Sequence, residues 1–423
     1  MASPTLGQRK PSTPVQRHRL GLGQGTALFT GAVLGPGVLA LPHLAAAAAG
    51  PASIIAWAAL LALSVPVALT FGALGARFPD GGGVATFAAR AFGPRISATV
   101  GWWFYGAVPL GVLAGALIGG DYVAAALGLG RPGALAVAAA LLAAGFAANH
   151  RGLRTSGRIQ LALVAGLTAL LVIAIAAAGP HASSANFTPF APHGGLGVAH
   201  AAGVLFFAFA GWEAASHLSA EFADPRRLLP RATVLTLAIV GTLYLALAVT
   251  VTAVLGDRAA TSPVPLALLM DEGIGPAARA GTAAAALVLS LVAINTYIAG
   301  GSRLGAAMAR DGALPARLAR GHRAGEIPHR SLLLLEALTL LVAVAVLPTG
   351  LGLDALMRAT AACLAAVTLV GAAAAVRLLP RRALARTATA FTAAVLLTCG
   401  VHLLVPAALA LAAQVVRRHR PIG

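Results

Sequence analysis

The stretch LFTGAVLGPGVLALP, residues 28–42, holds Gly35-Pro36-Gly37 inside an apolar run long enough to enter a membrane. A proline inside a helix removes one backbone hydrogen bond and clashes with the preceding turn, and glycines loosen the backbone further. In lipid, the freed N–H and C=O groups find no water, so such a break is tolerated only where it is buried in protein or lines a polar cavity. The sequence therefore predicts an interrupted helix, explained either by a packed kink or by a binding site.

Composition places the chain in a membrane. Of its 423 residues, 59% are hydrophobic and only 10% are charged, and apolar runs recur along almost the whole length. This pattern is typical of a polytopic membrane protein. The formal charge of +18 does not indicate nucleic-acid binding, because the basic residues stand in short groups between apolar runs and so resemble loop charges that set topology.

The apolar segments predict about twelve membrane-spanning helices, because each is near the ~20 residues that a helix needs to cross. With the N-terminus inside, 26 of the 30 Lys and Arg residues fall on the inner side, which favours cytoplasmic N and C termini. The predicted spans are residues 22–47, 51–76, 97–127, 133–149, 159–178, 198–221, 232–255, 280–302, 331–348, 353–376, 385–400 and 401–416.

A second interruption occurs in the sixth predicted span, VLFFAFAGWEAASHLSAEF (residues 204–222), where Gly211 and the ionisable Glu213 stand in apolar sequence. If spans 1–5 and 6–10 are two halves, both breaks fall in the first helix of a half. Paired interruptions of this kind indicate a transporter built from inverted repeats, with its site near the midplane. The expected organisation is a cytoplasmic tail (1–20), two five-helix repeats (21–178 and 198–380) joined by an outer loop (179–197), two further helices (381–416) and a second cytoplasmic tail (417–423).

Several motifs support this reading: RFPDGGGVATFAARAFGP (77–94), FAFAGWE (207–213) with EFADPRRLLPRA (221–232), and MARDGALP (308–315) with IPHRSLLL (327–334). Together with the Gly-x-Gly of the first span, their order and spacing resemble the amino acid-polyamine-organocation superfamily over nearly the whole chain. GWWFYGAVPLG (101–111) and the short chain are most similar to bacterial exporters of L-methionine and branched-chain amino acids. The resemblance implies alternating access to a small amino acid substrate.

The first break predicts donors for a substrate carboxylate. Free N–H groups at the start of the second half-helix carry a partial positive charge, and the residues placed there are Gly37, Val38 and Leu39. Pro36 supplies neither a hydroxyl nor an N–H, whereas many relatives have a small or hydroxyl residue at this position. One carboxylate donor is therefore missing.

The substrate ammonium needs acceptors, and here the resemblance supplies the positions. It implies main-chain carbonyls of Val33 in the first span and of Phe207 and Ala210 in the sixth. Gly35 and Gly211 are the flexible residues that open the two helices. Because these roles belong to the main chain, apolar side chains at the same positions are compatible with binding.

Glu213 is the only acid predicted near the middle of a span, and a charge there is costly and usually functional. Two interpretations remain: a proton-linked gate, or a fixed partner for loose N–H groups of the sixth span. His217 lies four residues further along the same helical face, where it either shares a proton with Glu213 or packs as a polar residue.

Aromatic residues near the breaks have two interpretations as well. Trp212 lies beside the second break, and Trp102, Trp103 and Tyr105 lie in the third span. They either close over a substrate or simply pack, as aromatic clusters at helical spacing usually do. Asn295 and Thr296 in the eighth span are candidates for an ion or water site, although a helix-packing hydrogen bond explains them better.

The expected protein is an all-α secondary transporter of neutral apolar amino acids in a bacterial inner membrane, coupled to protons or to exchange. A dibasic substrate should need a second buried acid. No nucleotide-binding loop, zinc-ligand cluster or nucleophile with its base is recognisable, so neither an enzyme nor a cofactor or metal is expected. The alternatives are an uptake permease for amino acids or amines and, from another class, a channel or membrane receptor.

Overall fold

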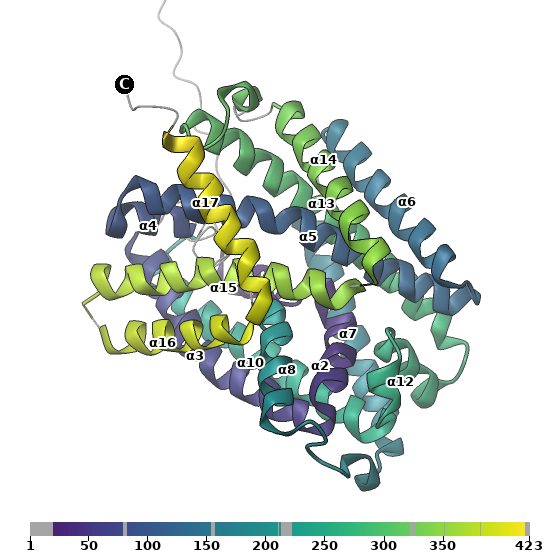
Figure 1. The fold of residues 1–423 in the computed structure, drawn as a ribbon. Helices are drawn as coiled ribbons and strands as arrows, with labels where there is room; N and C mark the ends of the chain where they lie inside the picture. The colour runs from purple at the N-terminus through teal and green to yellow at the C-terminus, as the bar shows by residue number, and fades with distance from the viewer. Residues whose placement is uncertain are drawn as a thin grey trace, which may run out of the picture.

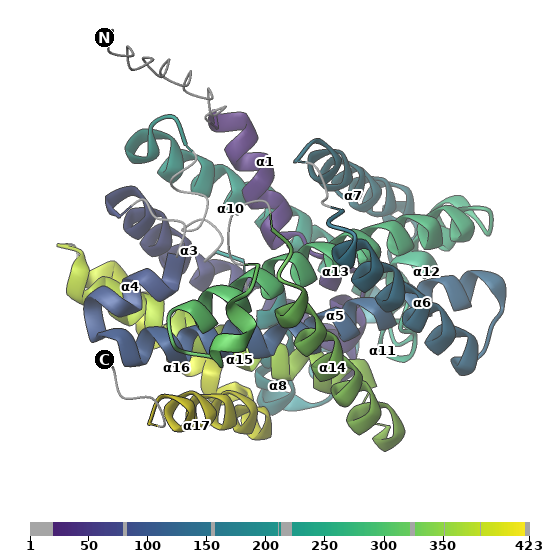
Figure 2. The same cartoon turned by 90° about the horizontal axis from the view of Figure 1, so that it is seen from above.

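The protein is almost entirely helical. A computed structural model describes residues 20–78, 83–153, 157–209, 211–212, 222–321, 326–350, 352–380 and 382–418. Within these residues the backbone forms α-helices, short 3₁₀ helices (η) and turns, with one isolated β-bridge between Leu20 and Phe222. Figure 1 and the view from above in Figure 2 show the helices packed into one bundle.

The helices follow the predicted spans closely. The first half consists of α1 (Leu22–Val33), η1 (Pro36–Leu39), α2 (Leu41–Ala49), η2 (Gly50–Ala52), α3 (Ser53–Arg77), α4 (Gly83–Phe92), α5 (Pro94–Leu127), α6 (Arg131–His150) and α7 (Gly157–Ala178). The second half consists of η3 (Gly179–His181), η4 (Ser184–Phe187), α8 (Gly194–Phe209), α10 (Pro225–Leu255), α11 (Arg258–Thr261), α12 (Pro265–Ile274), α13 (Ala278–Arg310), η6 (Ala316–Ala319), α14 (His329–Val346), η7 (Leu347–Thr349) and α15 (Gly352–Leu378). The chain ends with α16 (Arg382–Thr398), η8 (Gly400–Leu403) and α17 (Leu404–Arg418).

Within the described residues, eight helices are long and apolar enough to cross a membrane, or nine if the bent pair α16 and α17 forms one span. The prediction of about twelve exceeds this number because the first and sixth spans are discontinuous and because α16 and α17, with 17 and 15 residues, are each too short to count alone. At 1.5 Å per residue, α1 with 12 residues and α8 with 16 residues cannot cross alone. Residues 41–77 form one 37-residue apolar run, but Gly50, with φ +59°, turns the chain between α2 and α3.

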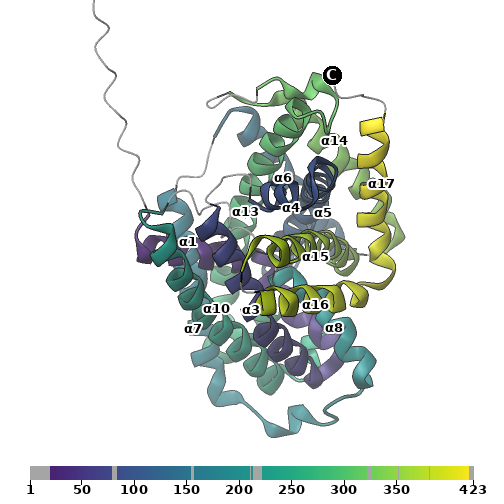
Figure 3. The same ribbon diagram turned by 90° about the vertical axis from the view of Figure 1, so that its left-hand side faces the viewer.

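The last two helices differ most from the expected pair of spans. α16 and α17 are separated at Gly400 and bent by 113° relative to each other. Figure 3 shows α17 passing along the side of the bundle, across the ends of α15 and α16. Gly400 has φ +56°, a conformation that side chains other than glycine adopt rarely. The single apolar run from residue 385 to residue 416 therefore changes direction at one glycine.

Helix α5 is the central element of the fold, packed against α13, α15 and α6. Small residues permit the close approach, as is usual between membrane helices. A Cβ built on Gly119 would lie 3.0 Å from Ser290 Cβ of α13, and one built on Gly301 would lie 3.0 Å from Val108 Cγ2 of α5. This tight contact holds α5 and α13 together, and both helices contact η1 of the first break.

Several of the motifs that suggested the family have a structural role at helix ends. Asp224 caps α10, its carboxylate accepting the Arg227 N–H at 3.3 Å, and Pro225 occupies the first turn, where proline is favoured. In the MARDGALP motif, α13 stops at Arg310 and Gly312 turns the backbone with φ +78°. The guanidinium of Arg310 binds the Asp311 carboxylate at 2.8 Å, as expected for a structural turn.

Candidate substrate site

The first span is interrupted as its sequence predicts. α1 ends at Val33, Gly35 is extended with φ −82° and ψ 175°, and η1 starts at Pro36. The first position of a helix suits proline because its N–H would have no partner there and its φ is already fixed near the required value. Pro36 therefore begins the second part of the span, and its missing N–H has a structural reason.

The N–H groups after the break are not all satisfied by the backbone. The Val38 N–H donates to the Gly35 carbonyl at 3.2 Å. The Gly37 N–H has no acceptor among the described residues, although Gly37 is buried. A buried N–H without a partner is costly, so a ligand acceptor at this position is stabilised. Gly37 is consequently the best placed of the predicted carboxylate donors.

The carbonyl that ends α1 is held from two sides. The Tyr244 hydroxyl, from α10, donates to the Val33 oxygen at 2.8 Å. The Gly35 N–H donates to the same oxygen at 2.9 Å. Tyr244 thus fixes the end of the first half-helix through a bond that spans 211 positions of the chain.

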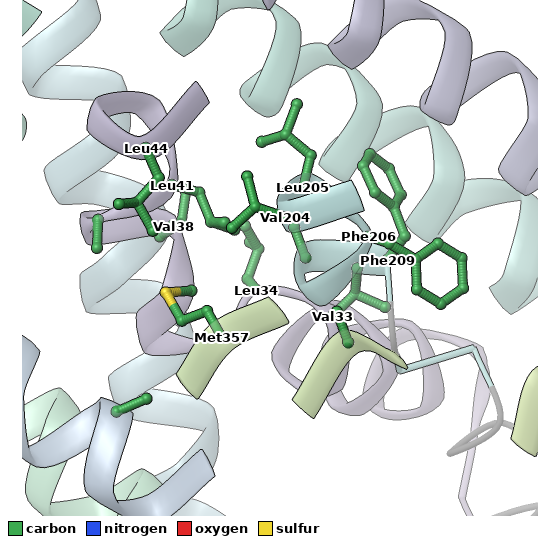
Figure 4. Packing of buried hydrophobic residues seen from close by; sticks show 14 of the residues in the cluster. Val33, Leu34, Val38, Leu41, Leu44, Val204, Leu205, Phe206, Phe209 and Met357 are labelled. Atoms are coloured by element: carbon green, nitrogen blue, oxygen red, sulfur yellow. The ribbon is translucent and has the colours of Figure 1, made fainter. Parts of the chain in front are cut away.

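The two breaks meet in space. α8 ends at Phe209, and Gly211 and Trp212 follow in a turn. A Cβ built on Gly211 would lie 2.8 Å from the Ala32 oxygen, so the turn lies directly against the end of α1. Figure 4 shows the side chains of Val33 and Leu34 in one cluster with those of α8. The phenyl ring of Phe207 covers the first break, because a Cβ on Gly37 would lie 2.7 Å from its Cε1.

A partly open cavity lies where these elements converge, with about 480 Å³ of space between atoms when the part open to solvent is included. The first break, α5, α8, α10 and α13 all contribute to its wall. It is lined by Ala32, Val33, Gly35, Pro36, Gly37, Val38, Gly111, Gly115, Ile118, Phe207, Ala208, Tyr244, Ala293, Ile294 and Tyr297.

Six of the residues named from the sequence line the cavity: Val33, Gly35, Pro36, Gly37, Val38 and Phe207. Leu39 is fully buried behind this wall, in η1. Gly211 packs on α1, and Trp212 beside it is buried, with no hydrogen-bond partner for its indole N–H among the described residues. Ala210, Glu213 and His217 lie outside the described residues.

Trp102 and Tyr105 lie away from the cavity. The indole N–H of Trp102 donates to the Ala313 carbonyl at 2.9 Å, after the end of α13. The Tyr105 hydroxyl donates to the Ser331 carbonyl at 3.3 Å, in α14. In this arrangement both side chains join α5 to the segments around the turn between α13 and α14, and neither is among the residues that line the cavity.

Comparison with known proteins identifies the family. A sequence model described as amino acid permease matches residues 20–421. The chain belongs to the amino acid permease family. It is 34% identical over 361 residues to the amino acid permease YecA of Bacillus subtilis, covering 85% of each chain.

Two further relatives have more specific descriptions. The permease is 37% identical over 231 residues to the L-methionine/branched-chain amino acid exporter YjeH of Escherichia coli, a match that covers 54% of each chain. It is 26% identical to the branched-chain amino acid permease BcaP of Bacillus subtilis, over 74% of this chain and 71% of that one. The structure resembles MhsT solved in complex with L-phenylalanine, with a TM-score of 0.59 at 15% identity, covering 94% of this chain and all of that one. This likeness concerns the fold.

Some lining residues of the permease were not singled out from its sequence. Tyr244, Tyr297, Ile118, Ala293 and Ile294 come from α5, α10 and α13, and nothing in their local sequence shows that they face the first break. One signal was available, because the chain has only four tyrosines and a hydroxyl inside a membrane helix must find a partner.

The glycines of α5 carried a second signal. Gly111 and Gly115 are four residues apart, so they lie on one helix face. Such spacing predicts a close contact between α5 and a neighbouring helix. In the permease both glycines also line the cavity. A Cβ built on Gly115 would lie 3.7 Å from Ile294 Cγ1, and one on Gly111 would lie 3.7 Å from Thr360 Cγ2.

Of the two polar residues of α13, Asn295 makes the helix-packing hydrogen bond that was expected, whereas Thr296 bonds within its own helix. The Asn149 side-chain amide of α6 donates to Asn295 Oδ1 at 2.7 Å. The Thr296 hydroxyl donates to the Val292 carbonyl one turn earlier, at 2.8 Å. Among the described residues, no group of three or more His, Cys, Asp or Glu side chains is arranged to hold a metal ion.

Proposed function

We propose that this permease carries neutral, apolar amino acids and exports L-methionine and branched-chain amino acids by alternating access. The observation that supports this is the make-up of the cavity. Among the residues that the structure describes, its polar groups are main-chain atoms of the first break and two tyrosine hydroxyls, and its lining includes no Asp, Glu, His, Lys or Arg. An uncharged side chain is therefore favoured, since a charged one would be buried without a partner.

Both charged ends of an amino acid find complementary groups in this proposal. The Gly37 N–H binds the carboxylate at the start of η1. The other two predicted donors are the Leu39 N–H and the Val38 N–H, and the latter must first leave the Gly35 carbonyl. The ammonium is placed near Val33 and the carbonyls of Phe207 and Ala210. The apolar side chain then points to α5 and α13, where Gly115 and Ile294 leave space between the helices.

Export is the direction we favour because the exporter YjeH is among the relatives. The permease BcaP supports the alternative, uptake by proton symport. The direction of transport depends on the substrate and ion gradients across the membrane, so it must be measured in cells. A strain that lacks the permease should become sensitive to methionine-containing dipeptides, which release methionine inside the cell. Normal growth of that strain on a panel of such dipeptides contradicts methionine export.

Transport assays in proteoliposomes distinguish a carrier from a channel or a receptor. A carrier preloaded with unlabelled L-leucine should show transient, saturable accumulation of external labelled leucine. Flux that does not saturate and is not stimulated by internal substrate favours a channel, and binding without flux favours a receptor.

Glu213 is our proposed proton-coupling residue, because no other acid was predicted near the middle of a span. His217 is the proposed proton-sharing partner. Glu213→Gln should abolish flux driven by a pH gradient and leave exchange intact. The matched control is Glu336→Gln, because Glu336 lies at the surface of α14, 3.3 Å from His150. Unchanged pH-driven flux in Glu213→Gln contradicts the role.

The proposed location is the plasma (inner) membrane of a bacterium, with both termini cytoplasmic. The distribution of basic residues supports this orientation. A cysteine-free background, made by replacing Cys363 and Cys399, would allow single cysteines near the termini to be labelled. Labelling by an impermeant maleimide in intact cells contradicts the cytoplasmic placement.

A further inference from the structure

The main-chain acceptor expected for the substrate ammonium is already occupied. The Val33 oxygen accepts the Tyr244 hydroxyl at 2.8 Å and the Gly35 N–H at 2.9 Å. A carbonyl oxygen has two lone pairs, so both are engaged. A third donor at this oxygen must therefore displace one of the two.

Tyr244 offers an acceptor that needs no displacement. A hydroxyl donates one hydrogen bond and has two lone pairs of its own. No donor to the Tyr244 oxygen is found in the part of the chain that the structure describes, and Tyr244 lines the cavity together with Val33. Donation to a carbonyl also polarises the hydroxyl, which strengthens its oxygen as an acceptor.

The ring of Tyr244 is held in place by aromatic neighbours. Its centroid lies 5.2 Å from that of Trp57 of α3 and 5.8 Å from that of Phe209, the last residue of α8. The side chain is 1% exposed. Because the ring is fixed, its oxygen keeps its position beside the Val33 carbonyl, between the ends of the two half-helices.

We propose that the Tyr244 hydroxyl oxygen accepts a hydrogen bond from the substrate ammonium, while the hydroxyl continues to donate its own hydrogen bond to the Val33 carbonyl. Tyr244 is then the side chain by which the permease selects ligands that carry an amine. This inference rests on the proposed function, because it assumes that an amino acid occupies the cavity.

The test compares two ligands that differ only at the amine. L-leucine and L-2-hydroxyisocaproate share the carboxylate and the apolar side chain, and a hydroxyl replaces the ammonium in the second. Apparent affinities are measured for purified wild-type protein and for Tyr244→Phe in proteoliposomes, by competition against labelled leucine. We expect Tyr244→Phe to weaken leucine binding about tenfold or more, the loss of one charge-assisted hydrogen bond. Binding of the hydroxy acid should change much less.

Tyr122→Phe is the matched control. The Tyr122 hydroxyl of α5 is equally buried and donates to the Leu39 carbonyl of the same break at 2.8 Å, but Tyr122 does not line the cavity. It should leave the ratio of leucine to hydroxy-acid affinity unchanged. Tyr297→Phe tests the other cavity tyrosine in the same assay. If the ratio of leucine to hydroxy-acid affinity falls in Tyr297→Phe but not in Tyr244→Phe, the inference is contradicted.

Unchanged or stronger leucine binding in Tyr244→Phe overturns the inference, because it shows that the ammonium binds the carbonyl directly or elsewhere. If this variant does not fold, the same assay uses protein made with 3-fluorotyrosine, whose hydroxyl oxygen is a weaker acceptor. Its affinity for leucine should then be reduced. An unchanged ratio of leucine to hydroxy-acid affinity in that protein contradicts the inference equally. A wild-type protein that exchanges no amino acid contradicts the proposed function and the inference together. Leucine exchange with an unchanged ratio contradicts the inference alone.

Discussion

The backbone of Gly211 lies against the carbonyl of Ala32, so close that a Cβ on this glycine would lie 2.8 Å from the oxygen. These residues belong to the two interrupted spans and are separated in the chain by more than the length of one repeat. Their contact brings the end of α1 and the turn after α8 to one point. The cavity forms around that point, which makes the contact a sensitive target for mutation.

Gly211→Ala should impair the permease, because the added methyl group meets main-chain atoms that cannot rotate away. Overpacking of this kind costs about 1–3 kcal/mol. We expect a lower melting temperature in detergent and a reduced rate of leucine exchange. Gly166→Ala in α7 is the control, since a Cβ there has no atom within 4 Å. Equal stability of the two variants would show that the breaks do not touch.

Gly37→Ala should clash with Phe207, whose Cε1 would lie 2.7 Å from the new Cβ. The ring is a side chain, so removing it relieves the clash. We therefore expect the double variant Gly37→Ala/Phe207→Ala to be more active than the two single effects predict. A double-mutant cycle on exchange rates measures this coupling. Purely additive effects would show that Phe207 does not cover the break.

Pro36→Ala should lower the apparent KM for leucine, because it restores an N–H at the start of η1, beside Gly37. One added hydrogen bond corresponds to roughly fivefold in affinity. Pro36→Ser tests whether a hydroxyl contributes further. The opposing effect is the lost restriction of φ, which proline supplies at this position. An unchanged or higher KM in both variants contradicts a carboxylate site at this helix start.

Gly115→Ala should change substrate size preference. Its Cβ would lie 3.7 Å from Ile294 Cγ1, in ordinary contact, so the methyl group reduces the cavity instead of breaking the packing. We expect leucine and methionine to lose affinity relative to alanine. Each methylene excluded from an apolar pocket corresponds to about 1–3 kcal/mol. Competition by the three amino acids measures the shift. The same order of affinities as in the wild type would place the substrate side chain elsewhere.

Most of the fold was predictable because its signals are local. Apolar length and the arginine distribution indicated the spans, and the glycines and proline at residues 35–37 indicated the first break. The end of α13 was predictable from its Asp-Gly turn. The short helices α1 and α8 also agree with their sequence, since each stops where the backbone loses its helical preference. The bend between α16 and α17 was not predicted, because the hydropathy of a continuous apolar run does not show in which direction the second helix leaves Gly400.

The sequence by itself determined the membrane class, the two breaks and the family, since hydropathy, backbone flexibility and motifs are properties of neighbouring residues. Only the tertiary structure decided what surrounds the breaks. It placed Tyr244 on the Val33 carbonyl, Phe207 over Gly37, and Trp102 and Tyr105 elsewhere. These contacts join positions far apart in the chain, and helix packing, which sets them, depends on which faces of several helices meet at once.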